Sequence, residues 1–242
     1  MSNAENHEQS RPAIEESSES HDRERNLYGQ SMGRKGAETR ERLIKATVDL
    51  LGSRSIRDVS VAEIAAAAGT SSSGFYIYFS DVSDAALAAA RRIEQITPEI
   101  EALLTRPWYH SNSLANAQAL IKAYVMFASR HEAILRVRNL AADEGDARFD
   151  EARDKAVERI KTLLATRIAA ARSTLEPNAG ASAVLALMER IAAISRLPIR
   201  RHHSRKSLIA AAGFIVANAL ASQERRADGS SFGSDDASGP LK

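Results

Sequence analysis

Residues 60–79 constrain the fold of this chain more than any other stretch. They read Ser-Val-Ala-Glu-Ile-Ala-Ala-Ala-Ala-Gly-Thr-Ser-Ser-Ser-Gly-Phe-Tyr-Ile-Tyr-Phe. Ser60, with Glu63 three residues later, predicts a capping box at the start of a short helix. Gly69 suits the left-handed conformation in which many helices end, and Ser71 can cap a second helix. Two short helices joined by such a turn form a helix-turn-helix, whose second helix can lie in a DNA major groove.

A longer helix is predicted directly before this motif, over residues 37–51. Its apolar residues recur at helical spacing and form one broad stripe: Leu43, Ile44, Ala46, Val48, Leu50 and Leu51. This stripe would support the two short helices from one side. The sequence therefore predicts a three-helix unit at this end of the chain.

Residues 37–97 resemble the amino-terminal domain of the TetR family of bacterial transcriptional repressors. The matching features follow the family's order and spacing: Thr39-Arg40, Ser60-Val61, Ile64-Ala65, Ala68-Gly69 and Phe75-Tyr76-Ile77-Tyr78-Phe79. The resemblance implies an all-α fold of about nine helices. Three small amino-terminal helices would carry the helix-turn-helix, and a larger carboxy-terminal domain would bind a ligand and form a dimer.

Composition agrees with packed helices. The 242 residues are 44% hydrophobic but only 5% aromatic, and alanine is abundant. The absence of cysteine excludes disulfides, thiolate zinc sites and cysteine nucleophiles. No apolar run approaches the length of a membrane span, and the first residues are polar and acidic. We therefore expect a cytoplasmic protein that does not associate with a membrane.

Four regions are predicted along the chain. Residues 1–36 and 223–242 are polar, lack an apolar period and are expected to be a disordered arm and tail. Residues 37–97 form the helix-turn-helix domain, and residues 98–222 form the second domain. Beyond the first three helices, the pattern predicts helices at 81–95, at 97 onward, and at 114–130, 132–142, 147–175, 181–196 and 206–222, with loops at 106–113, 176–180 and 197–205.

Charge gives little support to nucleic-acid binding. The net charge is +2, and residues 37–97 hold seven Arg and Lys against eight Asp and Glu. Residues 71–79 carry no charge, and Val82 stands where the resemblance implies a phosphate-binding lysine. We therefore expect weak non-specific binding that depends on flanking cations: Arg34, Lys35, Arg40, Arg42, Lys45, Arg54 and Arg57.

The second short helix divides into two kinds of residue. Phe75 and Phe79 lie four apart and are expected in the core. By resemblance, residues 72–74 face base edges and Tyr76 binds phosphate, as the hydroxyl of Tyr78 also could. The alternative is that the serines only start a helix. The predicted DNA-binding residues are Arg40, Ser60, Ser71, Ser72, Ser73, Gly74, Tyr76, Ile77 and Tyr78.

The last two helices carry two apolar faces. By resemblance they pair with the same helices of a second copy, through Val184, Leu187, Met188, Ile191, Leu208, Ala212, Ile215 and Ala219. Small residues at 210–213 allow close helix approach. An ordinary intrachain core would produce the same pattern, so the residues alone leave both interpretations open.

The remaining helices of the second domain are implied to enclose an effector. Large apolar residues there are candidates to line a pocket: Trp108, Tyr124, Phe127, Leu135 and Ile160. At these spacings a plain core is the alternative.

No pattern typical of a catalytic or metal site occurs in the sequence. A nucleophile elbow, Gly-x-Ser-x-Gly, fails because residue 73 is serine. His131-Glu132 begins a zinc-helix pattern, but position 135 is leucine rather than histidine. No phosphate-loop or dinucleotide glycine pattern occurs. We therefore expect no enzyme activity, no cofactor and no metal.

The sequence thus predicts a homodimeric transcriptional regulator, a repressor that binds a palindromic double-stranded DNA operator and is released by a small-molecule effector. The alternative is a helical protein that binds a small molecule or a partner and retains a vestigial helix-turn-helix. The near-neutral charge and Val82 favour that alternative. The aromatic cluster at 75–79 and the double capping argue against it.

Overall fold

The computed structural model of this protein describes residues 26–94, 96–171, 174–195 and 204–221. These residues contain no β-strand. They form a 3-10 turn at Ile56–Asp58 and ten α-helices: α1 (Arg34–Leu51), α2 (Val61–Ala67), α3 (Ser72–Phe75), α4 (Val82–Ala90), α5 (Pro98–Thr105), α6 (His110–Arg130), α7 (Glu132–Asp143), α8 (Ala147–Ala170), α9 (Pro177–Ile194) and α10 (Arg205–Leu220). The predicted all-α fold is confirmed.

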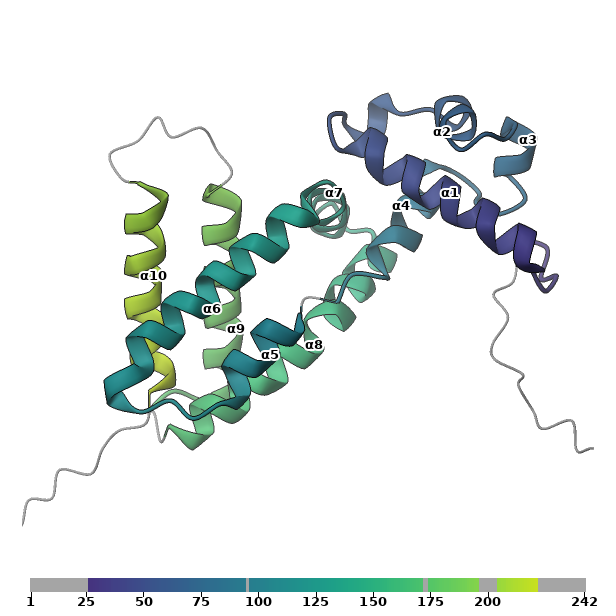
Figure 1. Ribbon diagram of the computed structural model, residues 1–242. Coiled ribbons are helices and arrows are strands. Elements are labelled where there is room, and N and C mark those ends of the chain that lie inside the picture. The colour runs from purple at the N-terminus through teal and green to yellow at the C-terminus, as the bar shows by residue number, and fades with distance from the viewer. Residues whose placement is uncertain (1–25, 95, 172–173, 196–203, 222–242) are drawn as a thin grey trace, which may run out of the picture.

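The helices form two groups (Figure 1), which we call the head (α1–α4) and the body (α5–α10). The head has a core of its own, formed around Leu43, Ile64, Phe75 and Phe79, all of them buried. The prediction that Phe75 and Phe79 point into the core is therefore confirmed. Their rings lie 5.6 Å apart between centroids.

Several predicted helix ends are wrong. Helix α1 begins at Arg34, inside the segment expected to be a disordered arm, and α6 begins at His110, inside a predicted loop. The predicted loop at 176–180 is the start of α9. There Pro177 occupies the first turn, and the Glu176 carboxylate accepts hydrogen bonds from the backbone N–H groups of Asn178 and Ala179. Proline suits this position because its missing donor would have no partner there.

Other predictions fall partly or wholly on residues that the structure does not describe. These are residues 1–25 of the predicted arm, residues 197–203 of the predicted loop, and the tail 223–242.

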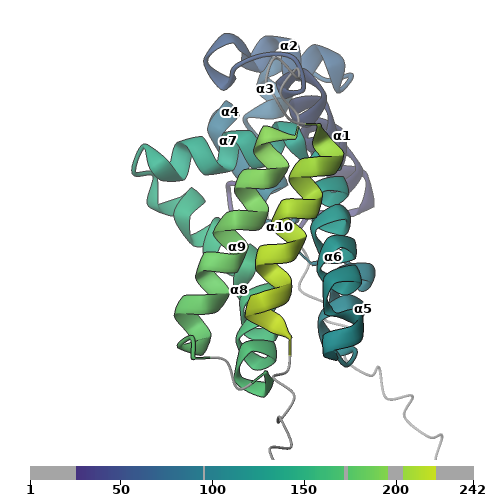
Figure 2. The same ribbon diagram turned by 90° about the vertical axis from the view of Figure 1, so that its left-hand side faces the viewer.

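The body surrounds a larger core built from α5, α6, α8, α9 and α10. Helices α9 and α10 run side by side along one face of the body (Figure 2). Gly213 of α10 lies so close to α6 that a Cβ placed on it would be 2.6 Å from Cγ of Gln118. The small residues at 210–213 therefore permit close packing within the chain.

Helix α7 joins the two cores. Its Ile134 and Val137 belong to the head core, whereas Leu135 belongs to the body core. The Arg136 guanidinium donates to the backbone oxygen of Leu51 at 2.6 Å, where α1 ends. The head core therefore extends past residue 97, and α7 fixes the orientation of α1 relative to the body.

Among the residues that the structure describes, none of the helices has the length and apolar character needed to span a lipid bilayer.

Candidate nucleic-acid interface

The capping box predicted at the start of α2 is present. The Ser60 hydroxyl accepts from the Glu63 backbone N–H, and the Glu63 carboxylate accepts from the Ser60 N–H at 2.9 Å. The hydrogen bond from the Ser60 hydroxyl is the main reason that the pKa of Glu63 falls to about 2, and Arg54, 2.6 Å away, lowers it further. Ser60 is exposed, but its hydroxyl is already used to start the helix.

The turn between α2 and α3 is fixed by backbone geometry. Gly69 has φ +69°, as the sequence predicted for a left-handed helix end. The N–H groups of Gly69 and Thr70 donate to the oxygens of Ala66 and Ala65, the two bonds of a Schellman motif. Arg42 of α1 adds a bond from Nε to the oxygen of Ala68 at 3.0 Å. Nothing in the local sequence pattern identified this role of Arg42.

Helix α3 is a single turn that begins at a serine cap. The Ser71 hydroxyl accepts from the Gly74 N–H at 3.1 Å and lies 2.8 Å from the Ser73 hydroxyl. A Cβ on Gly74 would overlap Oγ1 of Thr70. An alanine at position 74 would therefore require the Thr70 hydroxyl to move, and Gly74 itself is half-buried.

The remaining predicted residues separate by exposure. Ser71, Ser72, Ser73, Tyr76 and Ile77 are exposed on the head. Tyr78 is half-buried instead, with its hydroxyl 3.6 Å from the position that a Cβ on Gly36 would take. Its side chain packs toward the start of α1, so the structure does not group its hydroxyl with that of Tyr76.

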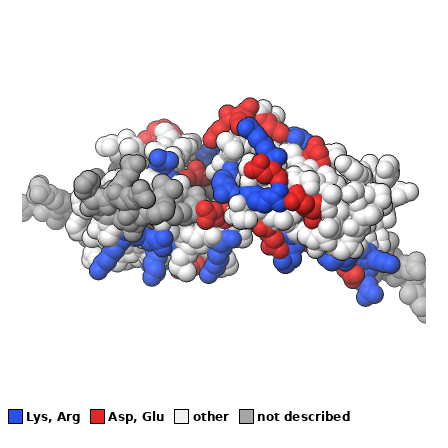
Figure 3. Space-filling model, turned by 90° about the horizontal axis from the view of Figure 1, so that it is seen from above, with Lys and Arg blue, Asp and Glu red and all other residues white. Residues whose placement is uncertain are grey.

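Several cations of the head form surface ion pairs with carboxylates of the same chain. Arg54 pairs with Glu63, Arg57 with Glu144, Lys45 with Asp49 and Arg92 with Glu41. The half-buried Arg40 lies over the Phe79 ring at 5.3 Å and lines a hollow of about 320 Å³. The α3 end of the head carries few charges, apart from basic side chains near the amino-terminal end of the described chain (Figure 3).

Two basic side chains stand out at the start of α1. Arg34 is almost fully exposed, and the ion pair that it forms with Glu38 is long, at 3.7 Å. Lys35 is exposed as well. Arg34 and Lys35 are therefore well placed to bind an anionic group that approaches from solvent.

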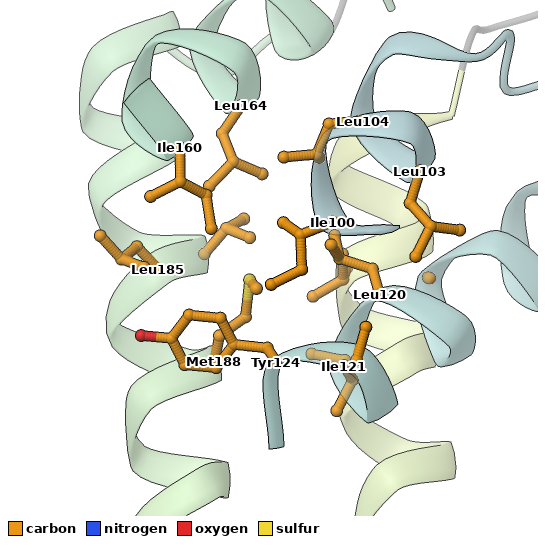
Figure 4. Close-up of a cluster of buried hydrophobic side chains, with 14 of the residues drawn as sticks. Ile100, Leu103, Leu104, Leu120, Ile121, Tyr124, Ile160, Leu164, Leu185 and Met188 are labelled. Carbon is orange, nitrogen blue, oxygen red and sulfur yellow. The ribbon is translucent and has the colours of Figure 1, made fainter. Parts of the chain in front are cut away.

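The residues predicted to line an effector pocket come together, but as packed core. Trp108, Tyr124, Phe127, Leu135 and Ile160 are all buried in one cluster. Tyr124 and Ile160 lie among leucine and isoleucine side chains (Figure 4). The Trp108 Nε1 donates to the Leu103 oxygen at 2.7 Å.

Two hollows of the body lie elsewhere, on its surface. One of about 580 Å³ lies between α5 and α8, and one of about 390 Å³ lies between α8 and α9. Both are lined by Lys155, Glu158 and Thr162, and none of the five predicted pocket residues lines either. The five side chains are buried in the body core, and their role in lining an effector pocket stays a prediction.

The residues predicted for a dimer interface differ in exposure. Val184, Met188, Ile191 and Ala212 are buried in the core of their own chain, and their part in a dimer interface stays a prediction. Leu187, Leu208 and Ala219 are half-buried. Ile215 is 56% exposed, and the neighbouring Phe214, which the sequence pattern did not single out, is 63% exposed. A regular apolar pattern could not separate these positions.

Comparisons with known proteins agree with this architecture. Residues 43–84 match the family model described as bacterial regulatory proteins, tetR family. Residues 100–221 match the model described as Tetracyclin repressor-like, C-terminal domain. No curated protein matches the sequence significantly.

Solved structures with the same fold have low sequence identity to this chain. The fatty acid degradation regulator FadR from Bacillus halodurans is 13% identical, with a TM-score of 0.57 over 78% of this chain and 97% of its own. A tetR-family regulator from Streptomyces coelicolor is 20% identical, with a TM-score of 0.55 over 76% and 80%. AibR, solved with isovaleryl coenzyme A and operator DNA, is 12% identical, with a TM-score of 0.53 over 75% and 99%.

Proposed function

This chain belongs to the TetR family of bacterial regulatory proteins. We propose that it is a homodimeric transcriptional repressor that binds an operator and is released from it by a small molecule. The observation that carries this proposal is the exposed row Ser72, Ser73 and Tyr76 on a helix whose start and preceding turn are fixed by side-chain and backbone hydrogen bonds. A fixed, uncharged polar surface of this kind suits a DNA major groove.

In this proposal the head residues have different tasks. Ser72 and Ser73 bind base edges, and Tyr76 donates its hydroxyl to a phosphate oxygen. Ser60 and Gly74 act indirectly, by starting α2 and by allowing the close turn before α3. Half-sites would lie about one helical turn, roughly 34–36 Å, or a multiple of it apart.

Phosphate neutralisation falls to the start of α1. Arg34 and Lys35 are exposed there, and the pair of Arg34 with Glu38 is long at 3.7 Å. Lys45, Arg54 and Arg57 form closer pairs with carboxylates, between 2.5 and 3.0 Å. Only a few ionic contacts are therefore made. This supports weak binding to random DNA and a modest dependence of affinity on salt.

The proposed dimer seam is the open face of α9 and α10. In Figure 2 these helices lie in front of the other described helices of the body. Phe214 and Ile215 offer the apolar surface, and Leu187, Leu208 and Ala219 lie half-buried on the same two helices. Neighbouring large apolar side chains that are both exposed are typical of surfaces that another protein covers. A second copy of the chain is the partner that the family implies.

The effector would enter the body core by repacking it. Most of the buried residues there are apolar, although Arg138 and Asn116 are buried in the body as well, so a small molecule with an apolar part fits their chemistry. Helix α7 then offers a route to the head, because it contributes to both cores and holds the end of α1 through Arg136. The effector relieves repression only if it binds the non-operator conformation more tightly than the operator-bound one.

The test starts with duplex selection. The full-length protein is used to select duplexes from a random library and from fragments of the host genome, and binding is then titrated at several salt concentrations. We expect enrichment of a palindrome. The double variant Lys35→Gln/Arg34→Gln should flatten the slope of log affinity against log salt by about 0.9 for each phosphate that is no longer neutralised.

Lys45→Gln is the matched control, since Lys45 is paired with Asp49 at 2.5 Å. It should leave the salt slope unchanged. Selection that enriches no sequence would overturn the proposal and favour a protein that binds only a small molecule. Short-chain acyl-coenzyme A thioesters are the first effector probes, because AibR was solved with one of them.

A further inference from the structure

Exposed apolar side chains gather beside α3. The described residues include eleven exposed large hydrophobic side chains, and four of them, between 40% and 71% exposed, belong to this one region of the head. They are Leu27 and Tyr28, before α1, and Tyr76 and Ile77, after α3. We call these four residues the apolar patch. Helices α1, α2 and α3 separate the two pairs in sequence, so only the fold brings them together.

A backbone hydrogen bond joins the two halves of the patch. The Leu27 N–H donates to the Ile77 oxygen at 3.1 Å. Residues 26–30, which we call the arm turn, are also held locally. The Asn26 side-chain oxygen accepts from the N–H groups of Tyr28 and Gln30 at 3.0 and 2.9 Å. The arm turn is therefore a defined element whose position is set by its hydrogen bond to Ile77, just after α3.

Glycine completes the turn. Gly29 has φ +75°, a left-handed conformation that few other residues adopt without strain. Its N–H donates to the Asn26 oxygen at 3.0 Å. This closure leaves Tyr28, the most exposed residue of the patch, directed away from the core of the head.

The chemistry of the patch selects among partners. Residues 26–31 and 71–79 carry no charge, and the exposed cations Arg34 and Lys35 follow within a few residues of the arm turn. An apolar surface with cations nearby in the chain suits a partner that combines apolar groups with phosphates. Duplex DNA offers this combination in the major groove, where the thymine 5-methyl group is the apolar feature of the base edges.

We propose that Leu27 and Tyr28 extend the DNA-reading surface and contact a thymine methyl group beside the bases that Ser72 and Ser73 reach. This inference rests on the proposed function, and it adds a specificity that α3 alone does not provide. The arm turn would favour an A·T pair at that position of each half-site. Asn26 is a positioning residue, because it holds the turn without itself offering an apolar surface.

The experiment uses the duplex that the full-length protein selects from a random library. Each thymine is replaced in turn by uracil, which removes only the 5-methyl group. At one thymine in each half-site, the wild-type protein should lose about fourfold in affinity, the fold-change for burying one methyl group. Leu27→Ala/Tyr28→Ala should bind the thymine duplex more weakly and should no longer distinguish thymine from uracil there.

A control variant makes the same two types of substitution outside the apolar patch. Tyr109→Ala/Leu140→Ala removes an exposed tyrosine and an exposed leucine from the body. It should retain the full thymine preference. Asn26→Ala keeps both apolar side chains but removes two acceptor bonds of the turn, so it should lose part of the preference.

The outcomes separate this inference from the function on which it rests. A wild-type protein that selects no duplex would remove the proposed function itself. A wild-type protein that selects a duplex, with the same uracil penalty in Leu27→Ala/Tyr28→Ala, would overturn only the role of the arm turn. Loss of dimerisation in Leu27→Ala/Tyr28→Ala would assign the patch to contact between copies and would likewise overturn it.

Discussion

The head and the body use their apolar residues in different ways. In the head, Phe75 and Phe79 are buried while Ser72, Ser73 and Tyr76 are exposed, so core and proposed function occupy different side chains of one short segment. In the body, every residue predicted to line an effector pocket is core, and so are half of those predicted for a dimer seam.

The difference reflects the range of the interactions involved. The head is defined by caps and a turn that act over a few residues, such as Ser60 with Glu63 and Ser71 with Gly74. The body is defined by which apolar helix faces meet, and its contacts join residues far apart in the chain. In the body, a core, a closed binding site and a subunit interface all use apolar residues, so the sequence pattern does not distinguish between these roles.

The largest expected effect comes from placing a charge in the body, either at a core position or at a position of the proposed dimer seam. Met188→Glu should lower the free energy of unfolding by about 4 kcal/mol, because the carboxylate is buried without a partner. Ile215→Glu should leave the far-UV circular dichroism helical and shift the protein from dimer to monomer in sedimentation.

Met188 is fully buried, whereas Ile215 is 56% exposed, so the pair separates core from seam. Equal loss of helical signal in both variants would mean that the face of α10 bearing Ile215 is also needed for the fold. An Ile215→Glu variant that remains a dimer would place the seam on another face.

A second prediction concerns close packing in the head. Gly74→Ala should cost about 1 kcal/mol of stability, because the Thr70 side chain must rotate to move Oγ1 away from the new methyl group. It should also weaken DNA binding by displacing α3. Thermal denaturation and titration with the selected duplex measure the two effects.

Thr70→Ala provides the matched rescue. The double variant Gly74→Ala/Thr70→Ala should recover much of the stability, since the atom that obstructs the methyl group is gone. If stability fails to recover, the cost of Gly74→Ala comes from its backbone conformation rather than from Thr70.

An effect confined to binding is expected from one hydroxyl group. Tyr76→Phe should weaken binding to all DNA sequences by about 1 kcal/mol, the typical net value of one hydrogen bond, with no change in melting temperature. Tyr78→Phe is the control, because its hydroxyl packs toward Gly36. If Tyr78→Phe weakens binding as much as Tyr76→Phe, the two tyrosines act together on the DNA.

The smallest effect concerns Glu63, which is exposed to solvent. Its pKa is lowered to about 2 from an ordinary value of 4.5, first by the Ser60 hydroxyl and then by Arg54. A lowered pKa in the folded state means that the ionised carboxylate stabilises the fold above pH 4.5. This contribution is lost as pH falls from 4.5 toward 2.

Ser60→Ala should raise the pKa of Glu63 back toward 4.5, which carboxyl-carbon NMR can follow during an acid titration. Arg54→Gln should raise it less, because Arg54 is the second cause rather than the first. An unchanged pKa in Ser60→Ala would show that the capping box does not govern the charge of Glu63.

The sequence by itself determined the local structure of the head. Ser60 with Glu63, Gly69 and Ser71 specify two helix starts and the turn between them, because each acts through hydrogen bonds or a dihedral preference within a few residues. The same information predicted the helical class of the whole described chain. It did not predict the end of α3 at Phe75 or the start of α9 at Pro177, where capping and packing compete within one turn.

Only the tertiary structure decided which similar residues are available to a partner. It buried Met188 and exposed Ile215, turned Tyr78 inward and left Tyr76 outward, and bound Arg54 and Arg57 to carboxylates of the chain. It also placed Leu27 beside Ile77, across a separation in sequence that no local pattern spans. Exposure and pairing depend on which helices pack together, and packing is a property of the whole chain rather than of any segment in it.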